Sequence, residues 1–138
     1  MENFQLNPRF VAGCFEIARK CGCRVLLKNE ANFPWIIIVP EIAAEIEELH
    51  ELEEARFAEV AGLTRNLSAF VDQYFSPDKV NIGCIGNQVR QLHIHIVGRF
   101  ESDPAWPGVV WSFDGKKKYD SSDSDEIIGA AKRYLDGL

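Results

Sequence analysis

The sequence predicts an α+β fold in which a mostly antiparallel sheet packs against a long helix. Short apolar or alternating segments within residues 14–39 and 79–100 have the length and spacing of β-strands. A long stretch rich in Ala, Leu and Glu separates these two groups, which indicates helix. No internal repeat and no long linker interrupts the 138 residues, so we expect a single domain over residues 1–138.

Composition narrows the class of ligand. Hydrophobic residues make up 46% and charged residues 26% of the chain, which is typical of a globular protein. The net charge of −6 argues against nucleic acid and membrane surfaces as partners, since both attract basic patches. The start of the chain lacks the pattern of a signal peptide, and the apolar run WIIIVP is too short to cross a bilayer. We therefore expect a cytoplasmic protein, and a small anionic ligand is compatible with its charge.

The cysteines are expected to be reduced thiols. They have small or apolar neighbours, and no secretion signal accompanies them. They are Cys14, Cys21, Cys23 and Cys84. A zinc site built from the first three and a distant ligand stays open, although a single C-x-C pair is a weak signal for one.

The first third of the chain predicts three strands. Residues 14–19 (CFEIAR) and 23–29 (CRVLLKN) read as a hairpin with a tight turn around Gly22. A polar turn ends at Pro34, and the following residues 35–39 (WIIIV) are apolar on both faces. Such a strand suits the centre of a sheet that is covered on both sides.

The sequence character changes to helix at Pro40, because proline is tolerated in a first turn and the following residues are good helix formers. The helix is expected to end before Pro77. Its apolar stripe consists of Val60, Leu63, Leu67, Phe70, Val71 and Tyr74. Its solvated face carries Glu45, Glu47, Glu48, Glu51, Glu53 and Glu54, with His50 as a surface histidine.

Two more strands and a closing helix follow. Residues 79–85 (KVNIGCI) and 91–100 (QLHIHIVGRF) predict strands that are joined by a turn, GNQVR. After a proline-rich connection, residues 114–125 predict an exposed loop, and Ser124 is the expected N-cap of the final helix. The apolar side of that helix consists of Ile127, Ile128, Ala131, Tyr134 and Leu135.

The segment QLHIHIV contains two of the three histidines of the chain. Because side chains alternate along a strand, Gln91, His93 and His95 are expected to form a polar row on one face. The residues between them, Leu92, Ile94 and Ile96, face the core. Three interpretations compete: hydrogen-bonded structural histidines, a metal site, and nucleophilic catalysis on phosphorus.

The catalytic interpretation uses the whole row. A metal site commonly needs three protein ligands, and only Glu101 or His50 is available in addition to the pair. A neutral imidazole, in contrast, can accept a phosphoryl or nucleotidyl group and release it to water. A second imidazole and an amide beside it can donate hydrogen bonds to the phosphate oxygens.

At this point the sequence resembles the histidine triad (HIT) superfamily of nucleotide hydrolases and transferases. QLHIHIV fits the pattern His-φ-His-φ-His-φ-φ, where φ is apolar, with Gln91 at the first histidine, as in a bacterial Q-L-H-x-H subgroup. The resemblance also covers the hairpin before WIIIVP and the segment AWPGVVW, and spans roughly residues 12–111. The resemblance does not cover residues 112–138, which are expected to form a C-terminal extension with a helix.

The resemblance implies roles for several residues. His93 would attack the α-phosphorus and form a nucleotidyl-histidine intermediate, and His95 would bind the non-bridging oxygens. Gln91 can donate a hydrogen bond but cannot titrate, and Trp35 stands where family members commonly have another histidine. Asn29 is the candidate for holding the ribose.

The candidates for phosphate contacts are Asn81, the loop residues Gly86, Asn87 and Gln88, and Arg99 on the histidine face. Lys28 and Arg90 are close to these segments in the sequence, and whether they are surface cations stays open. His93 is expected at a solvent-edged position, where His93→Ala would leave folding intact.

We expect a metal-independent hydrolase or transferase without a cofactor that acts on a nucleotide phosphoanhydride or phosphoramidate. Candidate substrates are dinucleoside polyphosphates and adenosine phosphoramidates. The resemblance also implies a homodimer. Two alternatives stay open: a catalytically silent module that binds nucleotides, and a metal protein with the ion mounted on the histidine strand.

Overall fold

The computed structural model describes residues 4–42 and 46–138. Its strands are β1 (Cys14–Lys20), β2 (Cys23–Lys28), β3 (Trp35–Pro40), β4 (Lys79–Gly83) and β5 (Ile94–Arg99). Its α-helices are α1 (Pro8–Gly13), α2 (Glu54–Phe75) and α3 (Ser121–Asp136), and two 3-10 turns are η1 (Leu49–Glu51) and η2 (Val110–Ser112).

Within the described residues the strands form a 5-stranded sheet in the order β1-β2-β3-β5-β4. Every pairing between neighbours is antiparallel. A bulge between Glu16 and Ala18 interrupts the register of β1 against β2. The prediction of an α+β fold with an antiparallel sheet and a long helix is confirmed.

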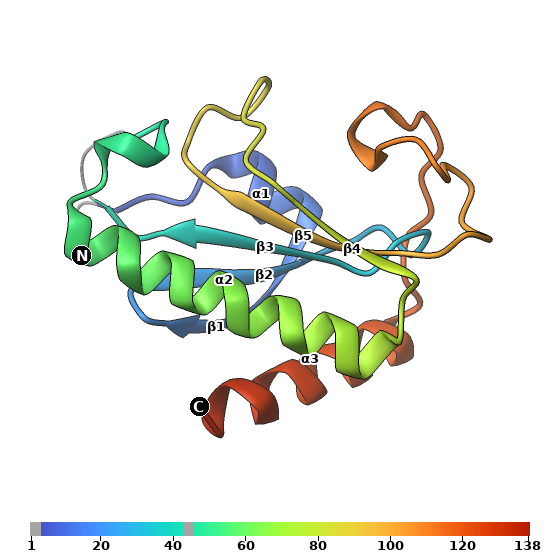
Figure 1. Ribbon diagram of the computed structural model, residues 1–138. Helices are drawn as coiled ribbons and strands as arrows, with labels where there is room; N and C mark the ends of the chain where they lie inside the picture. Colours follow the sequence, from blue (N-terminus) through green and yellow to red (C-terminus); the bar gives the residue numbers. More distant parts are fainter. Residues whose placement is uncertain (1–3, 43–45) are drawn as a thin grey trace.

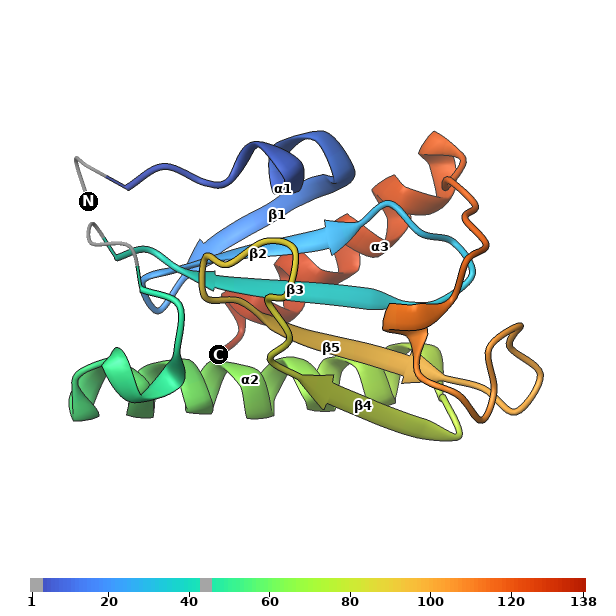
Figure 2. The same cartoon turned by 90° about the horizontal axis from the view of Figure 1, so that it is seen from above.

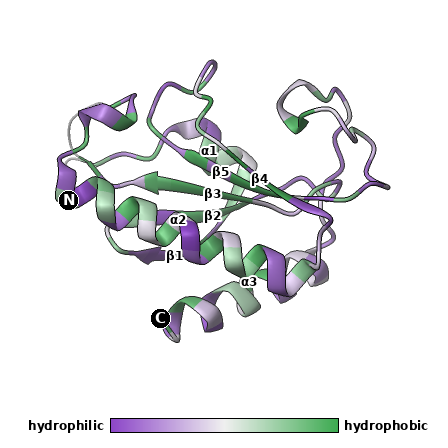
Figure 3. Cartoon of the chain, in the orientation of Figure 1, coloured by the Kyte–Doolittle hydropathy of each residue, from purple (hydrophilic) through white to green (hydrophobic). Residues whose placement is uncertain are grey.

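Strand β3 lies at the centre of the sheet, and all of its residues are buried. This burial explains the uninterrupted apolar run, because both faces of the strand are covered. In Figure 3 the colour of β3 and β5 is hydrophobic along the strands, whereas α2 alternates between hydrophobic and hydrophilic turns.

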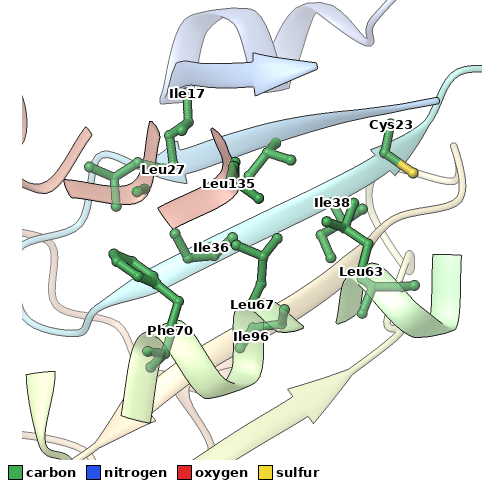
Figure 4. Close-up of a cluster of buried hydrophobic side chains, with 14 of the residues drawn as sticks. Ile17, Cys23, Leu27, Ile36, Ile38, Leu63, Leu67, Phe70, Ile96 and Leu135 are labelled. Atoms are coloured by element: carbon green, nitrogen blue, oxygen red, sulfur yellow. The ribbon is translucent and has the colours of Figure 1, made fainter. Parts of the chain in front are cut away.

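Helices α2 and α3 cover one face of the sheet (Figure 1). Figure 4 shows Ile36 and Ile38 of β3 pointing toward Leu63 and Leu67 of α2, and all four are at most 2% exposed. Helix α3 adds Ala131 and Leu135 to the same cluster. The apolar stripes predicted for both helices therefore form the main core.

The opposite face of the sheet is covered by α1, by the β4–β5 connection and by the segment that follows β5 (Figures 1 and 2). A second, smaller core lies there, where Phe10 of α1 and Val110 of η2 pack with Trp35, Ile37 and Val97 of the sheet. Side chains of β3 and β5 that alternate in sequence are thus divided between a structural core and this second face.

Several boundaries differ from the sequence prediction, including the end of β4, which lies at Gly83 and not at Ile85. The long helix begins at Glu54 and not at Pro40, because Pro40 still pairs with Cys23 in the sheet and the Glu41 N–H donates to the Gly22 carbonyl across 2.9 Å. Sheet pairing thereby overrides the helix propensity of the residues after Pro40. Glu45, predicted on the solvated helix face, lies outside the described residues.

Two further corrections concern β5 and α3. Strand β5 begins at Ile94, so Gln91 and His93 precede it. Helix α3 begins at Ser121, and Asp120 occupies the N-cap position predicted for Ser124. Ser124 is instead buried within the helix and donates its hydroxyl hydrogen to the Ser121 carbonyl at 3.1 Å. Helix α1 was not predicted.

Candidate active site

A cavity of about 570 Å³ opens on the sheet face opposite α2. Its floor is formed by strand residues, including His95 and Trp35. Its walls are residues 85–89 of the β4–β5 connection and residues 110–116. We call residues 110–119 the C-terminal strap. The volume lies within the range that is usual for small-molecule sites.

His93 lies at the base of this cavity, immediately before β5, and is 5% exposed. Its Nδ1 lies 2.6 Å from the backbone carbonyl of Gln91. Because a carbonyl oxygen can only accept, Nδ1 carries the proton of the neutral ring, and Nε2 keeps a free lone pair. The expectation of a solvent-edged position is wrong, since this histidine is buried.

His95 has the opposite tautomer. The indole N–H of Trp35 donates to its Nδ1 across 2.9 Å. An indole nitrogen can only donate, so Nδ1 of His95 is the acceptor and Nε2 carries the proton. The two rings are 4.6 Å apart between centroids. Two adjacent imidazoles therefore offer an unprotonated Nε2 and a protonated Nε2.

Burial keeps both histidines neutral. It lowers the pKa of His93, the hydrogen bond with the Gln91 carbonyl opposes this shift, and the charge of Lys28 lowers the pKa further. Burial also lowers the pKa of His95 to about 3, with smaller contributions from His93 and Lys28. At neutral pH neither imidazole carries a positive charge.

Aromatic rings enclose the histidine pair. Phe10 packs edge-on against His93 with 4.8 Å between centroids, and Trp111 packs in the same way against His95 at 5.4 Å. Phe33 and Phe113 line the cavity further out, with 5.4 Å between their centroids. The site thus combines a polar pair with an apolar, aromatic enclosure.

Gln91 does not belong to a row with the histidines. Its Oε1 accepts from the Asn7 N–H and its Nε2 donates to the Gln5 carbonyl, both at 2.9 Å. The predicted polar row of three side chains is not formed, because Gln91 and His93 precede β5 and strand alternation does not apply to them. The side chain of Gln91 holds the N-terminal segment, and its backbone carbonyl orients His93.

Arg99 lies on the same face as His95 but outside the cavity lining, and it is 1% exposed. Its guanidinium donates to the Asp103 carboxylate at 2.8 and 3.0 Å, and to Oδ1 of Asn81 at 3.0 Å. Burial alone would raise the pKa of Asp103, but hydrogen bonds from Arg99 and from the backbone outweigh it and lower the pKa. The phosphate contacts expected from Asn81 and Arg99 do not fit this placement, because the two side chains bind each other.

Asn29 is also engaged outside the cavity. Its Oδ1 accepts from the Tyr119 N–H at 2.9 Å and ties the β2–β3 hairpin to the C-terminal strap. The strap makes further bonds to this hairpin through the Ala31 N–H and the Glu30 carboxylate. Residues 114–116 of the expected exposed loop therefore line the cavity, and the bonds of Lys117 and Tyr119 hold the strap against the hairpin.

The predicted loop residues Gly86, Asn87 and Gln88 do line the cavity, together with both histidines. Gly86 has a φ of 70°, which favours glycine. Arg9 of α1 donates to Oε1 of Gln88 at 3.1 Å, so the loop is held from the N-terminal side.

Sequence reasoning missed several lining residues. Lys28 was considered only for its nearness in the sequence, and its place in the cavity could have been found from strand alternation, because it follows Leu26 by two positions and Leu26 belongs to the core on the cavity side. Phe10, Trp111 and Phe113 carried no such signal, since helix α1 and the strap reach the histidines only through tertiary packing. Trp111 Nε1 is buried without a hydrogen-bond partner among the described residues.

The described residues contain no group of three or more His, Cys, Asp or Glu side chains placed to hold a metal ion. The four cysteines are free thiols. Burial raises the pKa of Cys14 to about 11, with Lys28 opposing, and that of Cys23 to about 12, with Arg56 opposing. These two thiols are thus kept protonated at neutral pH.

Comparison with known proteins identifies the family. A HIT domain model matches residues 11–102. A histidine triad protein from Sinorhizobium meliloti is 32% identical with a TM-score of 0.93, covering 98% of this chain and 99% of that chain. One from Marinobacter aquaeolei is 32% identical with a TM-score of 0.92, covering 98% of each chain. One from Bradyrhizobium japonicum is 29% identical with a TM-score of 0.93, covering 96% of this chain and 98% of that chain.

The chain belongs to the HIT domain family, which confirms the resemblance seen in the sequence. Membership implies a nucleotide-binding hydrolase or transferase kind of function. No curated protein sequence shows a significant match to the chain. None of the helices in the described residues is both long and apolar enough to span a bilayer.

Proposed function

We propose that the chain hydrolyses or transfers a nucleotidyl group through a covalent intermediate on His93. The opposed tautomers of the two histidines carry this proposal. His93 presents a lone pair at Nε2 because its Nδ1–H donates a hydrogen bond to the Gln91 carbonyl, and His95 presents an N–H at Nε2 because its Nδ1 accepts from the Trp35 indole. A nucleophile therefore stands next to a donor for phosphate oxygens.

The first step forms a bond from Nε2 of His93 to the α-phosphorus. The bond between phosphorus and the leaving group breaks, and the leaving group departs with the electron pair and takes a proton from solvent. The imidazole then carries a positive charge, and the hydrogen bond from its Nδ1–H to the Gln91 carbonyl stabilises that charge. In the second step a water oxygen attacks phosphorus, the N–P bond breaks, the electron pair returns to Nε2, and a water proton passes to solvent.

The proposed substrates are dinucleoside polyphosphates and adenosine phosphoramidates. The cavity of about 570 Å³ has room for a nucleoside monophosphate portion, and its aromatic side chains can enclose the nucleoside. We assign phosphate contacts to the loop of Gly86, Asn87 and Gln88, whose backbone and side chains line the cavity beside His93. Asn29, Asn81 and Arg99 have no part in this proposal.

The decisive experiment is mass spectrometry of the protein after brief incubation with a diadenosine polyphosphate or an adenosine phosphoramidate. The reaction is stopped at neutral or alkaline pH, because N–P bonds to histidine are labile in acid. We expect a nucleotidyl adduct on His93 and its loss in His93→Gln, with folding checked by circular dichroism. Turnover by His93→Gln at the wild-type rate would contradict the assignment.

A catalytically silent nucleotide-binding module is the second candidate. The placement of Gln91 favours this candidate. Its side chain bonds to the N-terminal segment, so the residue at the position of the first family histidine places no side chain in the cavity. Such a module would bind adenosine nucleotides in calorimetry without forming an adduct or releasing product. The mass spectrometry experiment separates the two candidates.

We also propose that the protein is a homodimer, as its family resemblance implies. Strand β4 lies at the edge of the sheet, and its Ile82 is 51% exposed. An edge strand with an exposed apolar side chain suits pairing with a second copy.

A further inference from the structure

Lys28, the last residue of β2, brings a positive charge to the histidines. It lines the same cavity as His93 and His95, and its charge lowers the pKa of both. Leu26, two positions earlier, is buried on the cavity side of the sheet, so strand alternation directs Lys28 to that side as well.

Trp35 holds the ammonium group of Lys28 close to the pair. Nζ lies 4.7 Å from the centroid of the Trp35 ring, a distance at which a cation is attracted to the ring face. The edge of the same indole donates to His95. One tryptophan thus connects the cation and the imidazole.

No carboxylate lies within ion-pair distance of Lys28 in the described part of the chain. Glu30 also lines the cavity, but its Oε2 accepts from the Asn32 amide groups and from the Lys117 N–H. The charge of Lys28 is therefore not neutralised by an ion pair within the described residues. The charge of Arg99, in contrast, is neutralised by Asp103.

The reaction proposed above needs such a charge. A phosphate under attack gains negative charge in the transition state, and fixed positive groups beside it are effective in a buried site. Both imidazoles are held neutral, and Gln91 is turned away. Among the described lining residues the other cation, Lys116, lies on the exposed strap and not on the sheet.

We propose that the ammonium group of Lys28 binds the non-bridging oxygens of the phosphate that His93 attacks. Lys28 is then a catalytic residue, and Trp35 is the positioning residue that supports it. This inference rests on the proposed function, because it names a further group of the same site. It specifies a substrate whose reacting phosphate is anionic.

The test compares Lys28→Met, which keeps the length and apolar stem of the side chain, with Lys28→Arg, which keeps the charge. We expect Lys28→Met to lower kcat/KM about 100-fold or more, and Lys28→Arg to retain activity within about tenfold of wild type. Lys132→Met is the matched control, because Lys132 is exposed on α3, which packs on the other face of the sheet. Wild-type kcat/KM in Lys28→Met would overturn the proposal.

A binding measurement separates this proposal from the proposed reaction. Calorimetry with adenosine 5′-monophosphate and with uncharged adenosine is performed on wild type and Lys28→Met. We expect the variant to bind the monophosphate at least about tenfold more weakly and adenosine equally well, since the charge acts only on phosphate.

Four outcomes can be told apart. If Lys28→Met binds the monophosphate more weakly than wild type but wild type forms no adduct, Lys28 is supported as a phosphate ligand and the reaction is overturned. An adduct on His93 together with equal monophosphate affinity overturns the role of Lys28 alone. Equal weakening of adenosine and monophosphate would show a structural role and contradict the proposal. A wild type that binds neither compound overturns both.

Discussion

His93 and His95 are two positions apart, yet their Nδ1 atoms meet partners of opposite character. A backbone carbonyl accepts a hydrogen bond from one ring, and an indole N–H donates a hydrogen bond to the other. Hydrogen bonds of this kind select which ring nitrogen carries the proton. The chemistry proposed for the site follows from these two contacts and not from the histidines alone.

Trp35→Phe tests the contact to His95. The substitution removes the N–H but keeps an aromatic face, so Nδ1 of His95 loses its donor and the Nε2–H tautomer is no longer enforced. We expect kcat/KM to fall about 10- to 100-fold, by analogy with other residues that fix the tautomer of a functional histidine. The tautomer is read from ¹⁵N chemical shifts of the His95 ring.

Trp106→Phe is the control for this experiment, because Trp106 lies outside the cavity lining and contacts Arg99. It should leave the ring nitrogen shifts of His95 unchanged. If His95 keeps a protonated Nε2 and full activity in Trp35→Phe, the indole does not set the tautomer.

The depressed pKa of His95 makes stability depend on pH. In the unfolded chain the imidazole gains a proton below pH 6.5, whereas in the folded chain it does so only near pH 3. The unfolded state therefore binds more protons between these values, and the free energy of unfolding falls as pH is lowered. The expected slope is about 1.4 kcal/mol per pH unit, or about 2 kcal/mol at pH 5.

Denaturant unfolding at several pH values between 5 and 7.5 measures this effect. The free energy of unfolding should fall more steeply with decreasing pH in wild type than in His95→Gln. The difference between the two slopes should correspond to about one bound proton. His93, whose pKa is also lowered by burial, is present in both proteins and contributes to both pH profiles. Parallel pH profiles for the two proteins would show that His95 protonates freely in the folded state.

At the scale of elements, the start of β5 divides the histidine segment into two parts. Ile94 to Arg99 alternate between the core and the cavity side, as a strand requires. Gln91 to His93 are outside the strand, which frees the Gln91 side chain to hold the N-terminal segment and places its carbonyl on His93. One element boundary therefore decides the function of Gln91.

Helix α3 contributes to the core although it follows the residues that match the family model. We propose that the whole chain is one folding unit, and Leu135→Ala tests this. Leu135 is 1% exposed against the sheet, so its truncation should cost about 2–5 kcal/mol in the free energy of unfolding. Leu138→Ala, at a residue that is 51% exposed, should cost less than about 0.5 kcal/mol.

Denaturant unfolding followed by circular dichroism and by tryptophan fluorescence gives both values. Trp35 and Trp111 line the cavity, whereas α3 covers the opposite face of the sheet. A shift of both signals by the same amount in Leu135→Ala supports one cooperative unit. Loss of helical signal without a change in fluorescence would show that α3 unfolds separately.

At the scale of the whole molecule, the two faces of the sheet have different tasks. One face is buried under α2 and α3 by close apolar packing, and the other carries the cavity under α1, the β4–β5 connection and the strap (Figures 1 and 2). The central strands serve both, because their alternate side chains belong to different cores. A rigid core thus supports the histidine strand from behind.

The proposed homodimer is tested by light scattering coupled to gel filtration. We expect a mass twice the 15.6 kDa of the chain. Ile82→Asp should shift the mass toward that of one chain, because a charge on the edge strand opposes pairing. Val109→Asp, at a residue with the same 51% exposure in the loop after β5, should leave the dimer intact. A single-chain mass for wild type contradicts the dimer.

Much of the fold could be predicted from local patterns. The apolar run of β3, the alternation in β5 and the stripe of α2 each require a partner surface, and together they predict a covered antiparallel sheet. Boundaries were less accurate: Pro40 remains in the sheet and Asp120 precedes α3, because pairing and packing outweigh local propensity.

The sequence by itself determined the family, the antiparallel fold and the histidine pair, since these depend on spacing along the chain. Only the tertiary structure decided which ring nitrogens carry protons, that Gln91 faces away, and that Lys28 is the cation beside the pair. The physical reason is distance in sequence: Trp35 lies 60 positions from His95, and Gln5 lies 86 positions from Gln91. Hydrogen bonds and charges between such residues exist only once the chain has folded.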